Sequence, residues 1–419
     1  MIIRFLISAA AFAMAIFSGA FAQPTGLRPY GEIMKDAEAA FAAEDYGLAA
    51  ARIEEALAQR PYSLFLTRNL VLANLLAGEI APAIAIVTDI ADRGLYLEFP
   101  AHEAFERLRA EEAFKPVADR FQANARSVGT PLVVAEFTET GLLPEAIAKY
   151  GDGILIGSVR TGAIYAVRDG ALRKLATLDG GVFDIETLGS ATFAYAVINN
   201  QLAYENAGER PPEAAIVKVD LLSGEILWRR PIEAGNALLG DIELKPLRIY
   251  SSDSITPRLF VQDPDLIPRV LTEDSRFVNL QGLAADEGGR RLFVADYLAG
   301  LFVVDVLTRN VTQIENPTGA HLGGIDGLYL HKGDLIGIQN GTTPQRIVRI
   351  DLDKKGRVAK SLTVLQQALP EWNEPTHGFV DGDRFVYIAT SNWPAYGDDG
   401  EPVEGRPLAP LRIMSVDLN

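Results

Sequence analysis

The sequence predicts a two-part chain of α plus all-β type: a short α-helical repeat domain over residues 27–128 and a six-bladed β-propeller over residues 131–419. Three observations lead to this prediction. Residues 27–128 are rich in Ala, Glu and Leu with helical periodicity. A segment within them recurs after about 34 residues, a period typical of helical repeats. From residue 131 onward, short apolar runs bounded by turn residues recur about six times, as in propeller blades.

Composition excludes several classes of function. The 419-residue chain carries a formal net charge of −16, which opposes binding to the phosphate backbone of nucleic acids. It has no cysteine, so disulfides, thiolate catalysis and thiolate metal sites are excluded. The four histidines do not form the HExxH or HxH spacings of common zinc sites; they are His102, His321, His331 and His377.

The first 22 residues have the pattern of an export signal. Arg4 supplies a positive charge, Phe5–Phe17 is almost wholly apolar, and Ala20-Phe21-Ala22 matches a signal-peptidase site, which makes Gln23 the expected mature start. A membrane anchor is the alternative, although this apolar run is shorter than the ~20 residues that a spanning helix needs. We therefore expect an exported protein, periplasmic or secreted, with no membrane association after signal cleavage.

Residues 27–128 contain an internal repeat. Residues 43–49 (AEDYGLA) align with residues 77–83 (AGEIAPA), and in that register Ala49 corresponds to Ala83 and Ile53 to Val87. The period and the small residues resemble a tetratricopeptide array of two clear units and a weaker third, from 102 to 125. Such helices could do no more than pack on the next domain, or their concave face could bind a protein partner. The sequence leaves both open.

Six propeller blades are predicted from their opening segments. Residues 323–341 (GGIDGLYLHKGDLIGIQNG) show the pattern best: an acid–glycine pair, an apolar run, a polar break and a second apolar run. The openings are residues 143–148, 182–185, 239–242, 280–283, 323–328 and 375–380. Polar residues at the strand ends, Asp253, Asp296, Asn340 and Asn392, recur between them and are predicted to cap turns.

Polar residues at the openings should converge. The innermost strands of a propeller start around one end of a central channel, so these residues are close in space although distant in sequence. Carboxylates with amide or imidazole ligands suit a divalent cation such as Ca²⁺, Mg²⁺ or Mn²⁺, which can polarise a carbonyl or lower the pKa of water. The set comprises Glu145, Asp241, Gln281, Asp326 and His377, with Asp184 as a weaker member.

Three segments resemble a known family: GLLPEAIAKYGDGILIGSVRTGAIYAV, GIDGLYLHKGDLIGIQNGTTPQRIVRI and EPTHGFVDGDRFVYIATSNW. They resemble the SMP-30/gluconolactonase/LRE group of six-bladed propellers, which is related to strictosidine synthases. The resemblance implies metal ligands at Glu145, Asp326 and Gln281, of which Gln281 replaces an asparagine of the family. A second family asparagine falls on Gly240, which has no side chain.

Two functions follow as hypotheses. The first is a metal-dependent hydrolase that opens a lactone or small ester in the propeller mouth, with Asp241 and His377 as catalytic residues. The second is a non-catalytic binding or scaffold protein that uses the helical repeats and a propeller face. Each polar residue also has a structural alternative; Asp326-Gly327, for example, is ordinary turn chemistry. The two hypotheses differ in whether Glu145 and Asp326 point at a common place.

Overall fold

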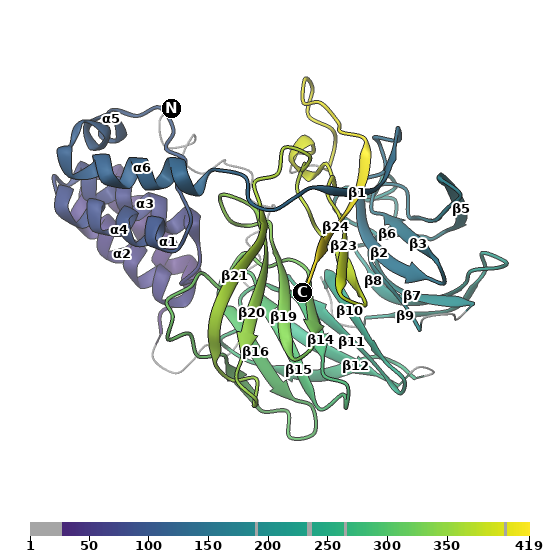
Figure 1. Cartoon of the computed structure of the whole chain (residues 1–419). Coiled ribbons are helices and arrows are strands. Elements are labelled where there is room, and N and C mark those ends of the chain that lie inside the picture. The colour runs from purple at the N-terminus through teal and green to yellow at the C-terminus, as the bar shows by residue number, and fades with distance from the viewer. Residues whose placement is uncertain (1–26, 189–191, 233–236, 264–265, 398–399) are drawn as a thin grey trace.

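The computed structural model describes residues 27–188, 192–232, 237–263, 266–397 and 400–419. The expected export signal lies outside these residues. Within them, none of the helices is both long and apolar enough to cross a bilayer. The described chain forms a helical part followed by a six-bladed β-propeller, which confirms the predicted fold class (Figure 1).

Six α-helices make up the first part, and they lie to one side of the propeller in Figure 1. Side chains of Asp45 and Ser63 cap the second and third helices by accepting hydrogen bonds from backbone N–H groups three residues ahead. The small repeat residues Ala49 and Ala83 are fully buried, as close helix packing requires. The helices are α1 Tyr30–Ala42, α2 Tyr46–Gln59, α3 Leu64–Leu76, α4 Ile80–Asp92, α5 Glu103–Ala110 and α6 Lys115–Asn124.

Each blade is a four-stranded antiparallel sheet. The first three blades are β2 Pro144–Tyr150, β3 Gly153–Ser158, β4 Ala163–Arg168 and β5 Ala171–Thr177; β6 Gly181–Thr187, β7 Phe193–Asn199, β8 Ala214–Asp220 and β9 Ile226–Pro231; and β10 Leu239–Lys245, β11 Arg248–Asp253, β12 Arg258–Gln262 and β13 Arg269–Glu273.

The next two blades are β14 Leu280–Ala285, β15 Arg291–Asp296, β16 Gly300–Asp305 and β17 Val311–Gln313; and β18 Leu328–His331, β19 Asp334–Gln339, β20 Arg346–Leu352 and β21 Ala359–Gln367. The sixth blade joins β22 Gly378–Asp381, β23 Arg384–Ile388 and β24 Leu411–Asp417 to β1 Leu132–Phe137, the first strand after the helices. Because β1 pairs with the last strand of the chain, the two ends of the propeller close one blade together.

The innermost strands form a closed ring. The inner strand of each blade packs against the inner strand of the next, and the last packs against the first. In order, these strands are β2, β6, β10, β14, β18 and β22. Apolar clusters fill the spaces between neighbouring blades. This closure brings the starts of six strands, which are up to 234 positions apart in the sequence (Pro144 to Gly378), to one end of the central channel.

Two predicted turn caps, Asp253 and Asp296, are confirmed. Each also accepts hydrogen bonds from the segment that leads into the inner strand of its own blade. Asp253 accepts the backbone N–H groups of Leu238, Ile255 and Thr256. Asp296 does the same for four N–H groups, those of Val278, Asn279, Leu298 and Ala299. Asn340, at the corresponding place in the fifth blade, differs: its side chain contacts Asp326 and Tyr297.

Candidate metal centre

The inner strands of blades one to four begin with a local irregularity in strand pairing. In β2, Pro144 pairs with Ser158 and Ala146 with Gly157, so Glu145 is an extra residue with no partner. Similar register shifts occur at the starts of β6, β10 and β14. A β-bulge of this kind re-aims a side chain, and bulges are common beside functional sites. Glu145, Asp241 and Gln281 lie within these bulges, and Asp184 directly follows the one in β6.

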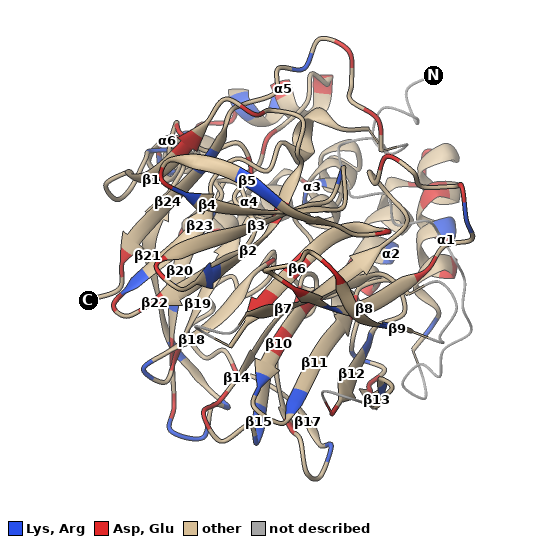
Figure 2. Cartoon of the chain, turned by 90° about the vertical axis from the view of Figure 1, so that its right-hand side faces the viewer, with Lys and Arg blue, Asp and Glu red and all other residues tan. Residues whose placement is uncertain are grey.

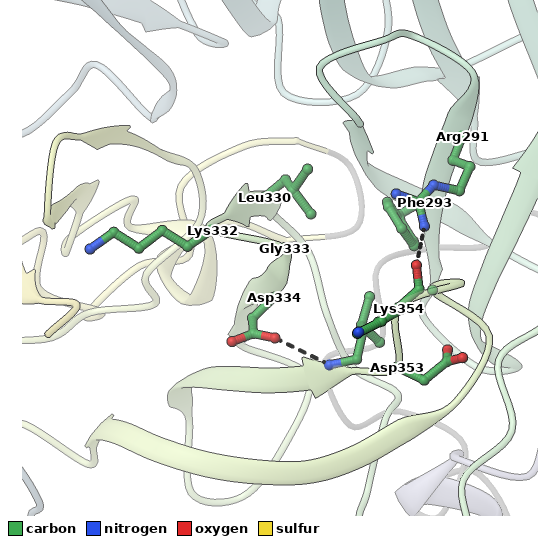
Figure 3. Close-up of a pocket in the computed structure, with 10 residues that line it drawn as sticks. Arg291, Phe293, Leu330, Lys332, Gly333, Asp334, Asp353 and Lys354 are labelled. Atoms are coloured by element: carbon green, nitrogen blue, oxygen red, sulfur yellow. Dashed lines mark hydrogen bonds between the residues drawn. The ribbon is translucent and has the colours of Figure 1, made fainter.

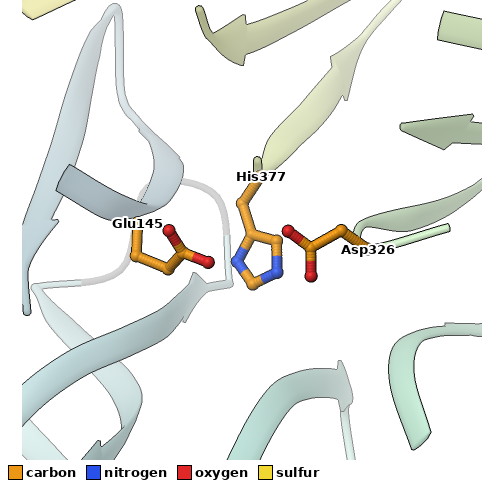
Figure 4. Close-up of side chains that lie close together, drawn as sticks. All are labelled: Glu145, Asp326 and His377. Atoms are coloured by element: carbon orange, nitrogen blue, oxygen red, sulfur yellow. The ribbon is translucent and has the colours of Figure 1, made fainter. Parts of the chain in front are cut away.

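Three side chains converge at this end of the channel. Glu145 from β2, Asp326 just before β18 and His377 just before β22 each offer one ligand atom, and these atoms lie within 4.8 Å of one another. Figure 4 shows the imidazole of His377 between the two carboxyl groups. Glu145 and His377 are buried, whereas Asp326 is partly accessible. Two carboxylates and an imidazole within this distance form a donor set that a divalent cation can use.

Each of the three side chains is held by a neighbour. The indole Nε1 of Trp393 donates a hydrogen bond of 2.6 Å to Glu145 Oε2. Asn340 Nδ2 donates one of 2.7 Å to Asp326 Oδ2. His377 Nδ1 lies 3.3 Å from Asp184 Oδ1. Groups that contact ligands in this way orient them and tune their basicity.

Burial dominates the electrostatics of the centre. It raises the pKa of Glu145 well above the usual range, and the nearby Asp326 carboxylate raises that pKa further. Burial is also the main cause that raises the pKa of Asp326. Burial lowers the pKa of His377, but the carboxylates of Asp184, Asp326 and Glu145 outweigh this and raise it well above its usual value. The group therefore holds protons that a bound cation would displace, because metal ligands must be deprotonated.

Asp241 and Gln281 lie outside the three-residue group. Burial, and then the Asp184 carboxylate, raise the pKa of Asp241 well above its usual range. Gln281 donates its amide to Asn279 Oδ1, and its Oε1 lies 3.0 Å from where a Cβ on Gly240 would be. The longer side chain of Gln281 thus fills the space that a residue larger than glycine would occupy in the third blade.

Further acidic side chains, Glu186 and Glu243, lie farther along the inner strands β6 and β10. Figure 2 shows acidic segments on β6 and β10, the inner strands of two neighbouring blades. Burial, followed by Glu243, raises the pKa of Glu186 well above its usual range, and Lys245 lies 2.7 Å from Glu243. Lys245 offsets part of this negative charge. Carboxyl groups therefore outnumber basic side chains among these named residues of the channel, and a cation that displaced their protons would meet negative ligands.

Sequence patterns did not reveal four contributors to the centre. These are Tyr297, Asn340, Glu374 and Trp393; Asn340 carried only the turn-cap prediction. Glu374 has a left-handed backbone with φ of 60°, and burial next to Asp326 raises its pKa to about 8. Their positions depend on loops that meet only after the ring closes. The one available signal was that Asn340 directly follows β19, the strand that pairs with β18, and that Asp326 lies just before β18.

A pocket lies away from this centre, and the polar groups described in it are engaged in structural hydrogen bonds. It lies at the opposite ends of blades four and five, where Asp334 accepts the N–H of Leu352 and Arg291 donates to the carbonyl of Lys354 (Figure 3). These polar contacts hold strand turns. The pocket is therefore separate from the channel end that holds Glu145, Asp326 and His377.

Comparison with known proteins adds little to this description. No protein-family model and no curated protein matches the chain. Many solved structures are similar in fold, and two of them illustrate the range. One is from Thermus thermophilus and is named as an oxidoreductase (glucose dehydrogenase); the match has 18% identity, covers 68% of this chain and 99% of that one, and has a TM-score of 0.46. The other is a chain of a nidogen/laminin complex, with 14% identity, coverage of 53% and 89%, and a TM-score of 0.40.

Proposed function

We propose that this protein is a divalent-metal-dependent hydrolase that acts on a lactone or a related small ester at the channel end of its propeller. One observation carries the proposal: Glu145, Asp326 and His377, from three different blades, direct ligand atoms to one place. Carboxylates in solvated turns would point apart. The sequence resemblance to the SMP-30/gluconolactonase group agrees with this chemistry.

The residues present fit a cation. Glu145 and Asp326 would supply oxygen ligands and His377 a nitrogen ligand, while Trp393, Asn340 and Asp184 hold them. Oxygen ligands suit Ca²⁺, Mg²⁺ and Mn²⁺, and an imidazole adds suitability for Zn²⁺. When bound, such an ion polarises the carbonyl of an ester and stabilises the negative charge that develops on it.

The chain's own residues would handle the protons. Hydrolysis adds one water across the acyl C–O bond, so that the hydroxyl joins the acyl carbon and a proton goes to the leaving oxygen. Asp241 is buried and its pKa is raised, which favours the protonated carboxyl group that could supply this proton. His377 is the second candidate, although its place between Glu145 and Asp326 favours a ligand role.

A protein-binding role is the second candidate function. It is favoured by the deep burial of Glu145 and His377, at 5% and 2% exposure, and by an open hollow between α1 and α2. The hollow has apolar and charged walls, formed by Asp36, Ala39, Ala40, Ala43, Asp45, Leu48 and Arg52. A short peptide segment of a partner protein could bind there.

Thermal unfolding with EDTA and then with Ca²⁺, Mg²⁺, Mn²⁺ or Zn²⁺ tests the proposal. A cation that binds only the folded protein at ~100-fold over its Kd should stabilise it by about 2.7 kcal/mol. Glu145→Gln and Asp326→Asn should abolish that gain, whereas Asp383→Asn, a change of a surface ion pair, should keep it. A positive result justifies a screen of lactones and small esters with the same variants. The absence of any cation effect in the parent protein would reject the metal-dependent mechanism.

A further inference from the structure

The helical domain contacts the propeller at the loops that lead to the candidate metal centre. Tyr62, between α2 and α3, donates its backbone N–H to the carbonyl of Leu298 at 3.1 Å. Its ring packs against His321 with centroids 5.0 Å apart, and its hydroxyl accepts from Asn316 Nδ2 at 3.3 Å. All three partners belong to loops at the channel end of the fourth blade or to its connection with the fifth.

Two glycines let the tyrosine approach this closely. A Cβ at Gly323 would overlap the Tyr62 Cβ, and one at Gly300 would lie 2.5 Å from Tyr62 Cε2. Side-chain carbons essentially never come so close without a shift of the backbone. The loop 297–300 and the segment that precedes Asp326 are thus both packed against one residue of the helical domain.

Tyr297 connects this contact to the metal centre. Its backbone carbonyl accepts from the N–H of Gly324 at 2.8 Å, and its ring lies against Gly341, where a Cβ would overlap it. The Tyr297 hydroxyl donates to Asn340 Oδ1 at 3.0 Å. Asn340 in turn donates to Asp326 Oδ2 at 2.7 Å. A continuous path therefore leads from Tyr62 to the carboxylate of Asp326.

This path sets the orientation of the Asn340 amide. The Tyr297 hydroxyl donates to the amide oxygen, which directs the amide nitrogen to Asp326. Without that hydroxyl, Asn340 could rotate and leave the Asp326 oxygen without its donor. Partners of this kind typically contribute about 10–100-fold to the affinity of a metal site.

We propose that Tyr297 is a positioning residue for Asp326, acting through Asn340, and that the helical domain holds Tyr297 in place through Tyr62. The helical repeats are then a structural part of the propeller site. The role in metal binding rests on the function proposed above. The hydrogen-bonded relay Tyr297–Asn340–Asp326 can be tested without any metal.

The first experiment measures Mn²⁺ binding to the purified chain by calorimetry or by electron paramagnetic resonance. Tyr297→Phe should weaken binding by about 10-fold or more. Tyr250→Phe is the matched control, because Tyr250 is also buried and its hydroxyl donates a hydrogen bond to the Gly289 carbonyl, away from the metal centre. Tyr62→Ala should weaken binding like Tyr297→Phe, and Tyr62→Phe, which keeps the ring, should bind normally. Unchanged Mn²⁺ affinity in Tyr297→Phe would overturn the positioning role.

The second experiment is a double-mutant cycle in EDTA, with Tyr297→Phe and Asp326→Asn compared by their unfolding midpoints. If the relay operates, the loss of stability in the double variant is smaller than the sum of the losses in the two single variants. The reason is that either change alone already disrupts the contact between Asn340 and Asp326. Strictly additive losses would overturn the relay. If the parent chain binds no Mn²⁺, the proposed hydrolase mechanism fails, and this cycle still decides whether Tyr297 positions Asp326.

Folding of Tyr62→Ala is checked by circular dichroism and by hydrogen exchange. Faster exchange at the Gly324 amide, with unchanged exchange in the first three blades, is expected from loss of the Tyr62 contact alone. Equal exchange at Gly324 in the parent and in Tyr62→Ala would show that the helical domain does not hold this loop.

Discussion

The imidazole of His377, in the sixth blade, lies 3.3 Å from the carboxylate of Asp184, in the second blade. The second Asp184 oxygen accepts the backbone N–H of Ile242, in the third blade, at 3.0 Å. One histidine therefore links strands from different parts of the ring, and the carboxylates of Asp184, Asp326 and Glu145 raise its pKa well above the usual value. This arrangement makes the centre sensitive to any change at His377.

Replacing His377 by Asn should destabilise the metal-free protein strongly. Removal of one partner from a buried ion pair typically costs about 3–5 kcal/mol, because the other charge stays buried without compensation. Urea unfolding at pH 7 in EDTA measures the loss. Asp383→Asn, which removes an exposed partner of Lys332, should cost less than about 1 kcal/mol. Equal stability of both variants would contradict a compensating role for His377.

Glu374 should make the metal-free protein less stable as pH rises. Its folded pKa of about 8 exceeds the ordinary value of 4.5, so the folded state holds the proton more tightly. The stabilising effect is complete below about pH 4.5 and is lost as pH rises through 8. After allowance for partial exposure, we expect a loss of about 2 kcal/mol between pH 5 and pH 8.

Glu374→Gln should remove this part of the pH dependence and raise stability at pH 8. Denaturant unfolding of both proteins across pH 5–8 in EDTA gives the comparison. Glu404→Gln, at an exposed site, is the control and should follow the parent curve. If Glu374→Gln also follows the parent curve, the carboxyl group is ionised in the folded protein near neutrality.

His321 should have the opposite effect and make the interface between the domains sensitive to acid. Both of its ring nitrogens lack a hydrogen-bond partner among the described residues, and burial lowers its pKa to about 3. An unfolded histidine takes up a proton near pH 6.5, so stability is lost as pH falls from there toward 3. At pH 5 the loss is about 2 kcal/mol.

His321→Leu should therefore unfold at higher denaturant concentration than the parent at pH 5, with a smaller difference at pH 8. His102→Gln serves as the control, because His102 caps α5 through Nδ1 and shows no comparable burial. A parallel pH dependence of the parent and His321→Leu would show that another group causes acid sensitivity.

Gly323→Ala should weaken docking of the helical domain. The added methyl group would overlap Tyr62, and overpacking of this kind costs about 1–3 kcal/mol. Calorimetry should show a lower midpoint, with the helical domain unfolding at a lower temperature than the propeller. Gly31→Ala adds a methyl group to α1 where nothing lies within 4 Å, so it should be neutral or stabilising. A single unchanged transition in Gly323→Ala would mean that Tyr62 can move without cost.

The sequence alone determined the features that depend on local periodicity. Helical spacing and the 34-residue repeat predicted the helices, and the burial of Ala49 and Ala83 agrees with that pattern. Alternating apolar runs and turn residues predicted six blades, because each strand and turn is specified by residues a few positions apart. Asp253 and Asp296 were recognisable as turn caps for the same reason.

Only the tertiary structure decided which side chains meet. The sequence groups Glu145, Asp326 and His377 with Asp241 and Gln281, because all five open inner strands. Closure of the ring brings Glu145, Asp326 and His377 together from three blades, while Gln281 turns toward Gly240 and Asn279.

Asn340, predicted as a turn cap, instead joins Tyr297 to Asp326, and Tyr62 reaches the same loops from a different domain. These contacts join residues 14 to more than 200 positions apart, and no local pattern encodes them. They arise because burial of apolar surface between blades sets the distances at which polar side chains must find partners.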